Sequence, residues 1–310
     1  MQYIYLLTGF VILLVSGEFL VRGGVALAKK IHISTLVVGV TVVSFGTSAP
    51  ELFVSVRAAL VGHPAIAIGN VLGSNISNIA LVLGLVAIIL PIPVKRKSIR
   101  IDCPIMLIAT LLFYLFILNG KLQFFEGLIF ILFLVGFITW SIHNSRKENY
   151  LLGRKLEKPR YRLFLAIVMV IISSIGLMVG ADWLVKGASE IARTFGMSEH
   201  AISVSVIALG TSIPELATSV LAAIRKEMDI SIGNIIGSNI YNLFGILGIT
   251  SMVREIEVGY NVIHFDVFWL LAISFLLFLF ILPFKGGKIT RLKGLIFLAS
   301  YAMYLYFVFR

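Results

Sequence analysis

The chain has 310 residues, of which 59% are hydrophobic and only 13% are charged. Soluble domains carry about 25% charged residues, so this composition argues against a soluble fold and against a disordered chain. Cys103 is the only cysteine, which excludes an intramolecular disulfide and a metal site built on paired thiolates. The formal net charge of +11 would suggest a nucleic-acid partner in a soluble protein, but the placement of the basic residues indicates another origin.

Ten apolar stretches are long enough for membrane-spanning helices, each of which needs about 20 apolar residues. In chain order they are residues 3–29, 35–60, 65–90, 101–119, 123–142, 161–192, 199–224, 229–252, 262–283 and 288–309. The sequence therefore predicts an all-α membrane protein with ten transmembrane helices. No basic residues precede the first stretch and the stretch has a partner later in the chain, so we interpret it as a helix of the mature protein and not as a signal peptide.

The basic residues gather in alternate connections between these stretches. These connections hold 19 of the 26 Lys and Arg residues: Lys29, Lys30, Lys95, Arg96, Lys97, Arg100, Arg146, Lys147, Arg154, Lys155, Lys158, Arg160, Arg162, Arg225, Lys226, Lys285, Lys288, Arg291 and Lys293. Cytoplasmic loops carry an excess of Lys and Arg, so we expect the loop 143–160 to be cytoplasmic and both termini to be extracellular. The charge then reflects topology and implies no nucleic-acid partner; a regulatory role for the basic loop stays open.

The sequence repeats itself when it is shifted by 164 positions. Gly46–Leu52 aligns with Gly210–Leu216, Gly73–Ile76 aligns with Gly237–Ile240, and 21 of the 41 positions between 44 and 84 are identical to their partners. Five stretches in each half is an odd number, so the second half enters the membrane from the opposite side. Such inverted-topology repeats are typical of secondary transporters, whose sites lie where the interrupted helices of the two halves meet.

We accordingly divide the chain into three parts. They are a first five-helix repeat at 1–145, a basic cytoplasmic linker at 146–160 and a second five-helix repeat at 161–310.

Two glutamates, Glu51 and Glu215, lie well inside the second and seventh stretches. A charge at the bilayer centre costs on the order of 3 kcal/mol, and the spans of the repeated motifs place no Lys or Arg at comparable depth. A proton or a bound cation is then the expected neutraliser. Pro50 and the Ser48-to-Glu51 spacing predict a broken helix that restarts with a capping box. The carbonyls left unpaired at such a break can coordinate a cation.

The third and eighth stretches carry matching polar stripes. Asn70, Ser74 and Asn78 are spaced to share one helix face, and Asn234, Ser238 and Asn242 repeat the pattern. Asn75 and Asn239 are expected to hold helices together. All these groups offer oxygen, which hard cations prefer, and Ca²⁺ takes 6–8 oxygen ligands. Two negative charges balance one Ca²⁺ or admit monovalent cations in its place, which is the physical basis of antiport.

The G-T-S-x-P-E segments at Gly46–Glu51 and Gly210–Glu215 resemble the paired repeats of the cation/Ca²⁺ antiporter superfamily, in particular its Na⁺/Ca²⁺ exchanger branch of prokaryotic type. The H⁺/Ca²⁺ branch has a G-N-A-x-E form there. The resemblance covers essentially the whole chain and implies that the first and sixth helices slide against the other eight.

The resemblance also implies roles for individual residues. Glu51 and Glu215 match the acidic pair that binds Ca²⁺, and Ser44 and Ala208 match positions that contribute backbone carbonyls. The remaining matches line the Ca²⁺ and Na⁺ sites: Thr47, Ser48, Ser74, Asn78, Thr211, Ser212, Ser238 and Asn242. Some relatives, K⁺-dependent ones among them, have Asp where this chain has Asn242, so K⁺ co-transport is not expected.

The sequence thus predicts a secondary active antiporter of the cell membrane that exchanges Na⁺ for Ca²⁺. It is not expected to be an enzyme, to hold a cofactor or to need an obligatory protein partner; its partners are the two ions and the lipid bilayer. H⁺/Ca²⁺ exchange is the first alternative, because a glutamate pair can also carry protons. A cation channel and an intramembrane enzyme with twin carboxylates are the others.

Overall fold

The structure is a computed structural model that describes residues 1–151, 161–197, 210–282 and 287–308. The first half contains α1 (Gln2–Ile31), α2 (Thr35–Val38), the π-helical η1 (Gly39–Val43), α3 (Ser44–Thr47), α4 (Ala49–Leu60), α5 (Ala65–Ser77), π-helical η2 (Asn78–Val82), α6 (Leu83–Ile89), β1 (Ile92–Pro93), π-helical η3 (Ser98–Asp102), α7 (Cys103–Phe116), the 3₁₀ turn η4 (Ile117–Asn119), β2 (Lys121–Leu122) and α8 (Phe124–Leu151).

The second half contains α9 (Leu163–Thr194), α12 (Ile213–Ile224), α13 (Met228–Ile240), π-helical η6 (Tyr241–Ile246), α14 (Leu247–Val253), β3 (Ile256–Glu257), π-helical η7 (Val262–Asp266), α15 (Val267–Ile281), β4 (Lys288–Ile289) and α16 (Arg291–Val308). Seven described helices are long and apolar enough to cross a membrane, or eight if a bent pair at 35–60 is counted as one span. The prediction of an all-helical fold is confirmed; the number of ten spans stays a prediction.

The elements of the two halves recur at the spacing found in the sequence. Shifted by 164 positions, α4 coincides with α12, α6 with α14, β1 with β3, and η3 with η7. The π-helical segments η2 and η6 also fall at corresponding places, beginning at Asn78 and Tyr241. A π-helical turn inside an α-helix is rare and occurs often at functional sites, so its recurrence beside the two polar stripes draws attention to that region.

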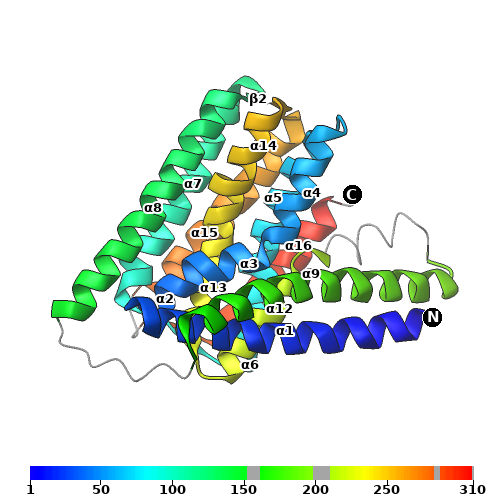
Figure 1. Ribbon diagram of the computed structural model, residues 1–310. Coiled ribbons are helices and arrows are strands. Elements are labelled where there is room, and N and C mark those ends of the chain that lie inside the picture. The colour runs from blue at the N-terminus through cyan, green and yellow to red at the C-terminus, as the bar shows by residue number, and fades with distance from the viewer. Residues whose placement is uncertain (152–160, 198–209, 283–286, 309–310) are drawn as a thin grey trace.

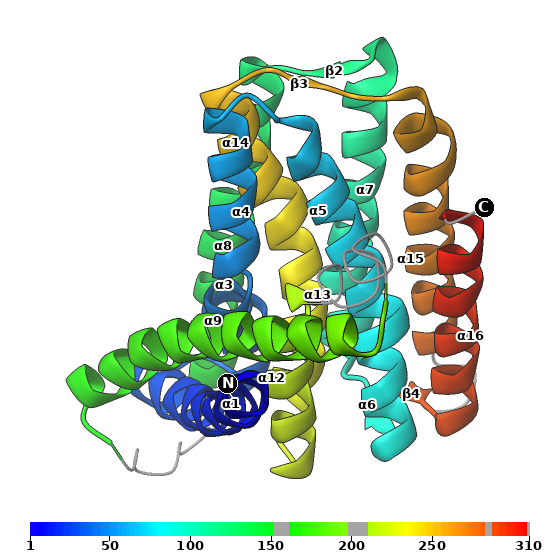
Figure 2. The same cartoon turned by 90° about the vertical axis from the view of Figure 1, so that its right-hand side faces the viewer.

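The helices α1 and α9 lie side by side and cross the remaining helices at a steep angle, as Figures 1 and 2 show from two directions. Glycines permit this close approach. A Cβ on Gly9 would lie 2.5 Å from the backbone nitrogen of Leu184, and a Cβ on Gly187 would lie 2.5 Å from that of Leu6. Real Cβ atoms do not come so near to backbone, so only glycine allows this spacing between the two helices.

The two helices that carry the polar stripes occupy the centre of the molecule. The apolar window of Met228–Val253 is 94% buried and that of Ala65–Ile89 is 72% buried, whereas the other candidate spans are 28–39% buried. The large core cluster is built around them from residues such as Ile79, Ile236 and Phe244. The outer helices therefore face lipid, while α5 and α13 are enclosed by protein on nearly all sides.

Two short antiparallel ladders join the halves at opposite ends of the bundle (Figure 2). Ile92 of β1 pairs with Ile289 of β4, and Leu122 of β2 pairs with Ile256 of β3. Each ladder thus links a strand of one half to a strand of the other, which fixes the relative position of the two halves at both ends.

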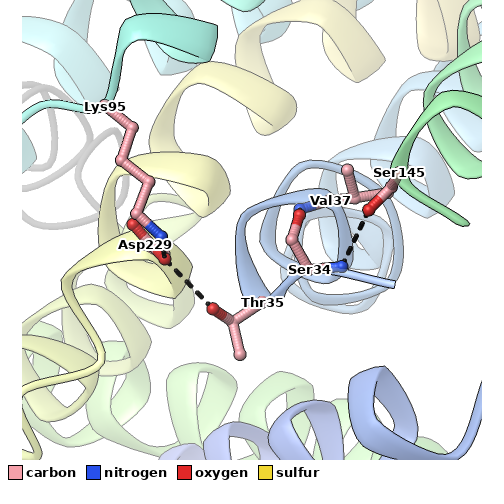
Figure 3. A network of polar contacts seen from close by, with 6 residues as sticks. All are labelled: Ser34, Thr35, Val37, Lys95, Ser145 and Asp229. Carbon is pink, nitrogen blue, oxygen red and sulfur yellow. Dashed lines mark hydrogen bonds and ion pairs between the residues drawn. The ribbon is translucent and has the colours of Figure 1, made fainter. Parts of the chain in front are cut away.

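Polar contacts tie several connections together at one end of the bundle, and Figure 3 shows these contacts from close by. The backbone N–H of Ser34, between α1 and α2, donates to Ser145 Oγ of α8 at 2.9 Å. Thr35 donates to Asp229 of α13 at 3.2 Å, and Lys95 forms an ion pair with the same carboxylate. The starts of α2 and α13 and the end of α8 are therefore tied together at this end.

The second span is broken where the sequence predicts a break. The helix 35–47 and the helix 49–60 meet at Ser48 with a bend of 47°. Pro50 has no N–H, so the carbonyl of Gly46 cannot receive the usual helical hydrogen bond. The predicted capping box is wrong: Ser48 and Ser212 occupy the N-cap positions of α4 and α12, but neither side chain caps its helix.

Candidate ion-binding site

Two carboxylates lie in the first turns of α4 and α12, at the middle of the molecule. The side chains of Glu51 and Glu215 are both fully buried. Among the described residues, neither forms an ion pair with Lys or Arg. A buried charge without a partner is strongly unfavourable, so each carboxyl group must either be protonated or, when it is ionised, be neutralised by a bound cation.

Glu215 receives hydrogen bonds from both halves of the chain. Ser48, at the break between α3 and α4, donates to Glu215 Oε1 at 2.9 Å, and Ser238 of α13 lies 3.5 Å from the same oxygen. The other oxygen, Oε2, has no hydrogen-bond partner within the described part of the chain. The hydroxyl that the capping box would have used therefore turns across the molecule to the carboxylate of the opposite half.

The surroundings of Glu51 differ. Neither of its carboxylate oxygens has a hydrogen-bond partner in the described ranges, and the same holds for Ser212 Oγ, the counterpart of Ser48 Oγ. Its backbone carbonyl accepts a hydrogen bond from Asn70 at 3.2 Å. Three oxygen atoms on this side are thus buried without partners, which is an arrangement that a bound cation would satisfy.

The two threonines of the broken segments each face the opposite half. Thr47 donates to Asn234 Oδ1 at 3.0 Å and lies 3.4 Å from Ser238 Oγ. Thr211 lies 3.4 Å from Ser74 Oγ. The sequence-predicted hydroxyl residues are therefore brought together in pairs that cross from one half to the other.

The asparagines of the π-helical segments are also buried at the site. Both polar atoms of Asn78 and the Oδ1 of Asn242 have no partner in the part of the chain that the structure describes. The amide of Asn242 donates to Asn75 Oδ1 at 3.0 Å, and the amide of Asn75 donates to the carbonyl of Asn239 at 3.2 Å. Sequence reasoning assigned Asn75 and Asn239 only to helix contacts and missed that Asn75 holds a candidate ligand.

The two predicted carbonyl positions have different outcomes. The carbonyl of Ser44 accepts the backbone N–H of Ser48 at 2.9 Å and the hydroxyl of Thr47 at 3.3 Å. Its own hydroxyl donates to Val40. Ala208 lies outside the described residues.

The donor set as a whole is made of oxygen. Within the described residues no group of three His, Cys, Asp or Glu side chains is placed to hold a metal ion. A cation bound here would therefore rely on two carboxylates together with hydroxyl, amide and backbone oxygens. Ca²⁺ and Na⁺ accept such mixed oxygen shells, whereas transition metals prefer nitrogen and sulfur ligands.

Comparisons with known proteins agree with this chemistry. The family described as "Sodium/calcium exchanger protein" matches residues 1–143 and 165–310. The putative antiporter CaxA of Alkalimonas amylolytica is 36% identical over 99% of this chain and 98% of its own length. The sodium/calcium exchanger MaX1 of Methanosarcina acetivorans is 29% identical over 99% of this chain and 98% of its own. A solved structure of the sodium-calcium exchanger NCX_Mj, soaked with Na⁺ and Sr²⁺, is 33% identical, with a TM-score of 0.83 over 97% of this chain and 96% of that one.

Proposed function

Because the chain belongs to the sodium/calcium exchanger protein family and is a multi-pass membrane antiporter, we propose that it exchanges Na⁺ for Ca²⁺ by alternating access. The observation that carries this proposal is the pair of fully buried glutamates, one from each half, set among hydroxyl and amide oxygens. Two negative charges are neutralised by one Ca²⁺ or by monovalent cations that replace it. MaX1 and NCX_Mj, which resemble this chain over nearly its whole length, are named as sodium/calcium exchangers.

In this proposal Glu51 and Glu215 coordinate Ca²⁺. The hydroxyls complete the Ca²⁺ and Na⁺ shells, and the backbone carbonyls near the helix breaks supply further oxygens. The proposed ligand set is Glu51, Glu215, Thr47, Thr211, Ser48, Ser212, Ser74, Ser238, Asn78, Asn242 and the carbonyls of Ser44 and Ala208. The unpartnered oxygens of Glu51 and Ser212 support it, because buried polar atoms otherwise find hydrogen-bond partners.

The proposed architecture is ten transmembrane helices in two inverted-topology repeats, at 1–145 and 161–310, joined by the linker 146–160. The recurrence of elements at a spacing of 164 supports it, as do the two ladders at opposite ends of the bundle. The end that gathers Lys95 and the start of α13 is assigned to the cytoplasm, because cytoplasmic loops are rich in Lys and Arg. Both termini are then extracellular and the 143–160 loop is cytoplasmic.

The test is radioactive Ca²⁺ uptake into proteoliposomes that hold the purified protein. With Na⁺ inside and choline outside, we expect saturable uptake that stops when the internal Na⁺ is replaced by choline. We also expect uptake to be electrogenic, as measured with a potential-sensitive dye. Uptake driven by a pH gradient without Na⁺ would establish H⁺/Ca²⁺ exchange instead, and non-saturable flux that needs no counter-ion would establish a channel.

A further inference from the structure

The hydrogen bonds at the centre of the molecule fall into two groups. Those of the first group recur when both partners are shifted by 164 positions. They are the 3.4 Å contacts Thr47–Ser238 and Ser74–Thr211, and the 3.0 Å bonds from Asn70 to Ser55 and from Asn234 to Ser219. These contacts make the two halves of the site alike.

The asparagine contacts of the second group do not recur. Asn75 donates to the carbonyl of Asn239 and accepts from Asn242. The shifted counterparts would be a bond from Asn239 to the Asn75 carbonyl and a bond from Asn78 to Asn239 Oδ1. Instead, the Asn239 amide donates to Ile235 of its own helix at 2.9 Å. Asn239 Oδ1 and both polar atoms of Asn78 have no partner among the described residues.

Two of these three unpartnered atoms, Asn78 Nδ2 and Asn239 Oδ1, are therefore the ones that the missing bond would join. All four asparagines are at most 1% exposed, so bulk water does not reach their amides and cannot replace a missing hydrogen bond. Leaving a buried donor or acceptor unsatisfied is costly, and the same groups are satisfied on the other side of the pair. Since both halves supply the same side chains, a second arrangement in which the pattern is exchanged satisfies the same number of groups. Two packings of similar free energy are the physical requirement for a two-state element.

We propose that Asn75 and Asn239 are positioning residues that form a two-position hydrogen-bond switch between α5 and α13. In the described position, Asn75 reaches across to α13 and holds Asn242. In the other position, Asn239 releases Ile235, donates to the Asn75 carbonyl and holds Asn78. The switch therefore decides which of the two candidate ligands at the π-helical segments is fixed in place.

This inference rests on the proposed function, because an antiporter alternates between two access states and needs an element that prefers one arrangement in each. The switch links that requirement to the site, since each position orders the ligands of one half. Ser48 follows the same pattern: it is bonded to Glu215 in the described position, while Ser212 and Glu51 are unpartnered.

The test uses the pair Asn75→Ala and Asn239→Ala. Right-side-out and inverted membrane vesicles from the same cells give the apparent Ca²⁺ affinity on each side, and their ratio reports the balance of the two states. Each variant removes the two bonds that cross between the halves in one position and, in the other position, only a bond within a helix, so we expect the ratio to move about 2- to 10-fold, in opposite directions for the two variants. The double variant should return towards the ratio of the unmodified protein.

Matched controls are Ser55→Ala and Ser219→Ala, which remove contacts present in both halves and should leave the ratio unchanged. If the two asparagine variants move the ratio in the same direction, or lower uptake from both sides equally, the residues only hold the helices together and the switch is overturned. Should either alanine variant fail to elute as a folded monodisperse protein, Asn75→Ser and Asn239→Ser replace the pair. Absence of Na⁺-driven flux in the unmodified protein contradicts the proposed function, a different result from a same-sign shift.

Discussion

The two glutamates of the candidate site occupy equivalent places in the two halves and have different surroundings. Glu215 accepts a hydrogen bond from Ser48 of the opposite half, whereas Glu51 and Ser212 make no such contact in the described residues. The sequence of the motif is the same around both. A duplicated sequence therefore supplies matching groups, and the conformation decides which of them are bonded.

The two halves also differ away from the candidate site, on the crossing helices α1 and α9. Glu18 of α1 forms an ion pair with Arg22 of its own helix at 2.6 Å and a second one with Arg225, at the end of α12, also at 2.6 Å. Its counterpart on α9, Asp182, has one described ion pair, with Lys186 of the same helix at 2.7 Å. In the first half, the position that corresponds to Arg225 is Val61, which offers no charge. Thus α1 is clamped to the core at a point where α9 is not.

The largest effect is expected when one of the two buried carboxylates is replaced, since each half supplies one of them. We predict that Glu51→Gln and Glu215→Gln each lower Na⁺-driven Ca²⁺ flux to below about 1% of the unmodified value. Loss of one charged partner of a buried ion costs about 3–5 kcal/mol. Flux is measured in proteoliposomes, with size-exclusion elution as the check that the variants are folded. A folded variant with near-normal flux would show that its carboxylate does not coordinate the ion.

The second prediction concerns Asn242, which is uncharged and fully buried. With two carboxylates at the centre, adding K⁺ to a bound Ca²⁺ leaves an excess positive charge in a medium of low dielectric, where Coulomb energies are large. We therefore expect Na⁺-driven Ca²⁺ flux to be unchanged when K⁺ is replaced by choline. Asn242→Asp adds a third carboxylate, which should either make flux more sensitive to pH or create a requirement for an additional monovalent cation.

Asn78→Asp is the matched variant for this second prediction, because Asn78 occupies the corresponding place in the first half. The two aspartates sharpen the comparison if they act differently, since only Asn242 is held by a described hydrogen bond. Collapse of flux on K⁺ removal in the unmodified protein would show that the lack of Asp at position 242 does not predict K⁺ independence.

The sequence predicts the fold better than it predicts the side-chain contacts at the centre of the molecule. The apolar stretches and the shift of 164 placed the helices, and Pro50 placed the break at Ser48. The capping box failed because a hydroxyl in a buried helix break has a choice of partners, and Ser48 bonds to a carboxylate 167 positions away. Local spacing carries no information about such a partner. The unequal roles of Asn75 and Asn239 were hidden for the same reason, since the two copies carry the same residue at these positions and the sequence cannot express a difference between them.

The third prediction concerns the ion pair between Glu18 and Arg225, which holds α1 to the end of α12. Glu18 is 17% exposed at its side chain and accepts from two arginines, so we expect Glu18→Gln to lower the free energy of unfolding by about 1–2 kcal/mol. Asp182→Asn removes a pair that is more than half exposed, and we expect a change below about 0.5 kcal/mol. Thermal unfolding in detergent measures both. Equal losses would mean that the bond to Arg225 adds nothing to the contact within α1.

The smallest effect concerns the two ends of the bundle. Lys121 of β2 pairs with Glu255, beside β3, at 2.8 Å, and both side chains are exposed. The hydrogen bond with Lys121 lowers the pKa of Glu255, and the bond with Glu255 raises the pKa of Lys121. Because the pKa of Glu255 is lowered by folding, its contribution to stability is fully present above its unfolded pKa and is lost as the pH falls through its folded pKa. Because the pKa of Lys121 is raised by folding, its contribution to stability is fully present below its unfolded pKa and is lost as the pH rises through its folded pKa.

The pair at this end therefore contributes only between these two pKa values, and solvent screens it strongly. We expect Lys121→Gln to lower the melting temperature slightly at neutral pH and low salt, with no difference at high salt or once Glu255 is protonated. At the opposite end, Asp229 is 18% exposed at its side chain and holds both Lys95 and Thr35. Lys95→Gln should accordingly have the larger effect of the two and persist further into high salt, because its partner is less accessible to ions. A larger loss from Lys121→Gln would show that the exposed pair, and not the half-buried one, secures the ends of the bundle.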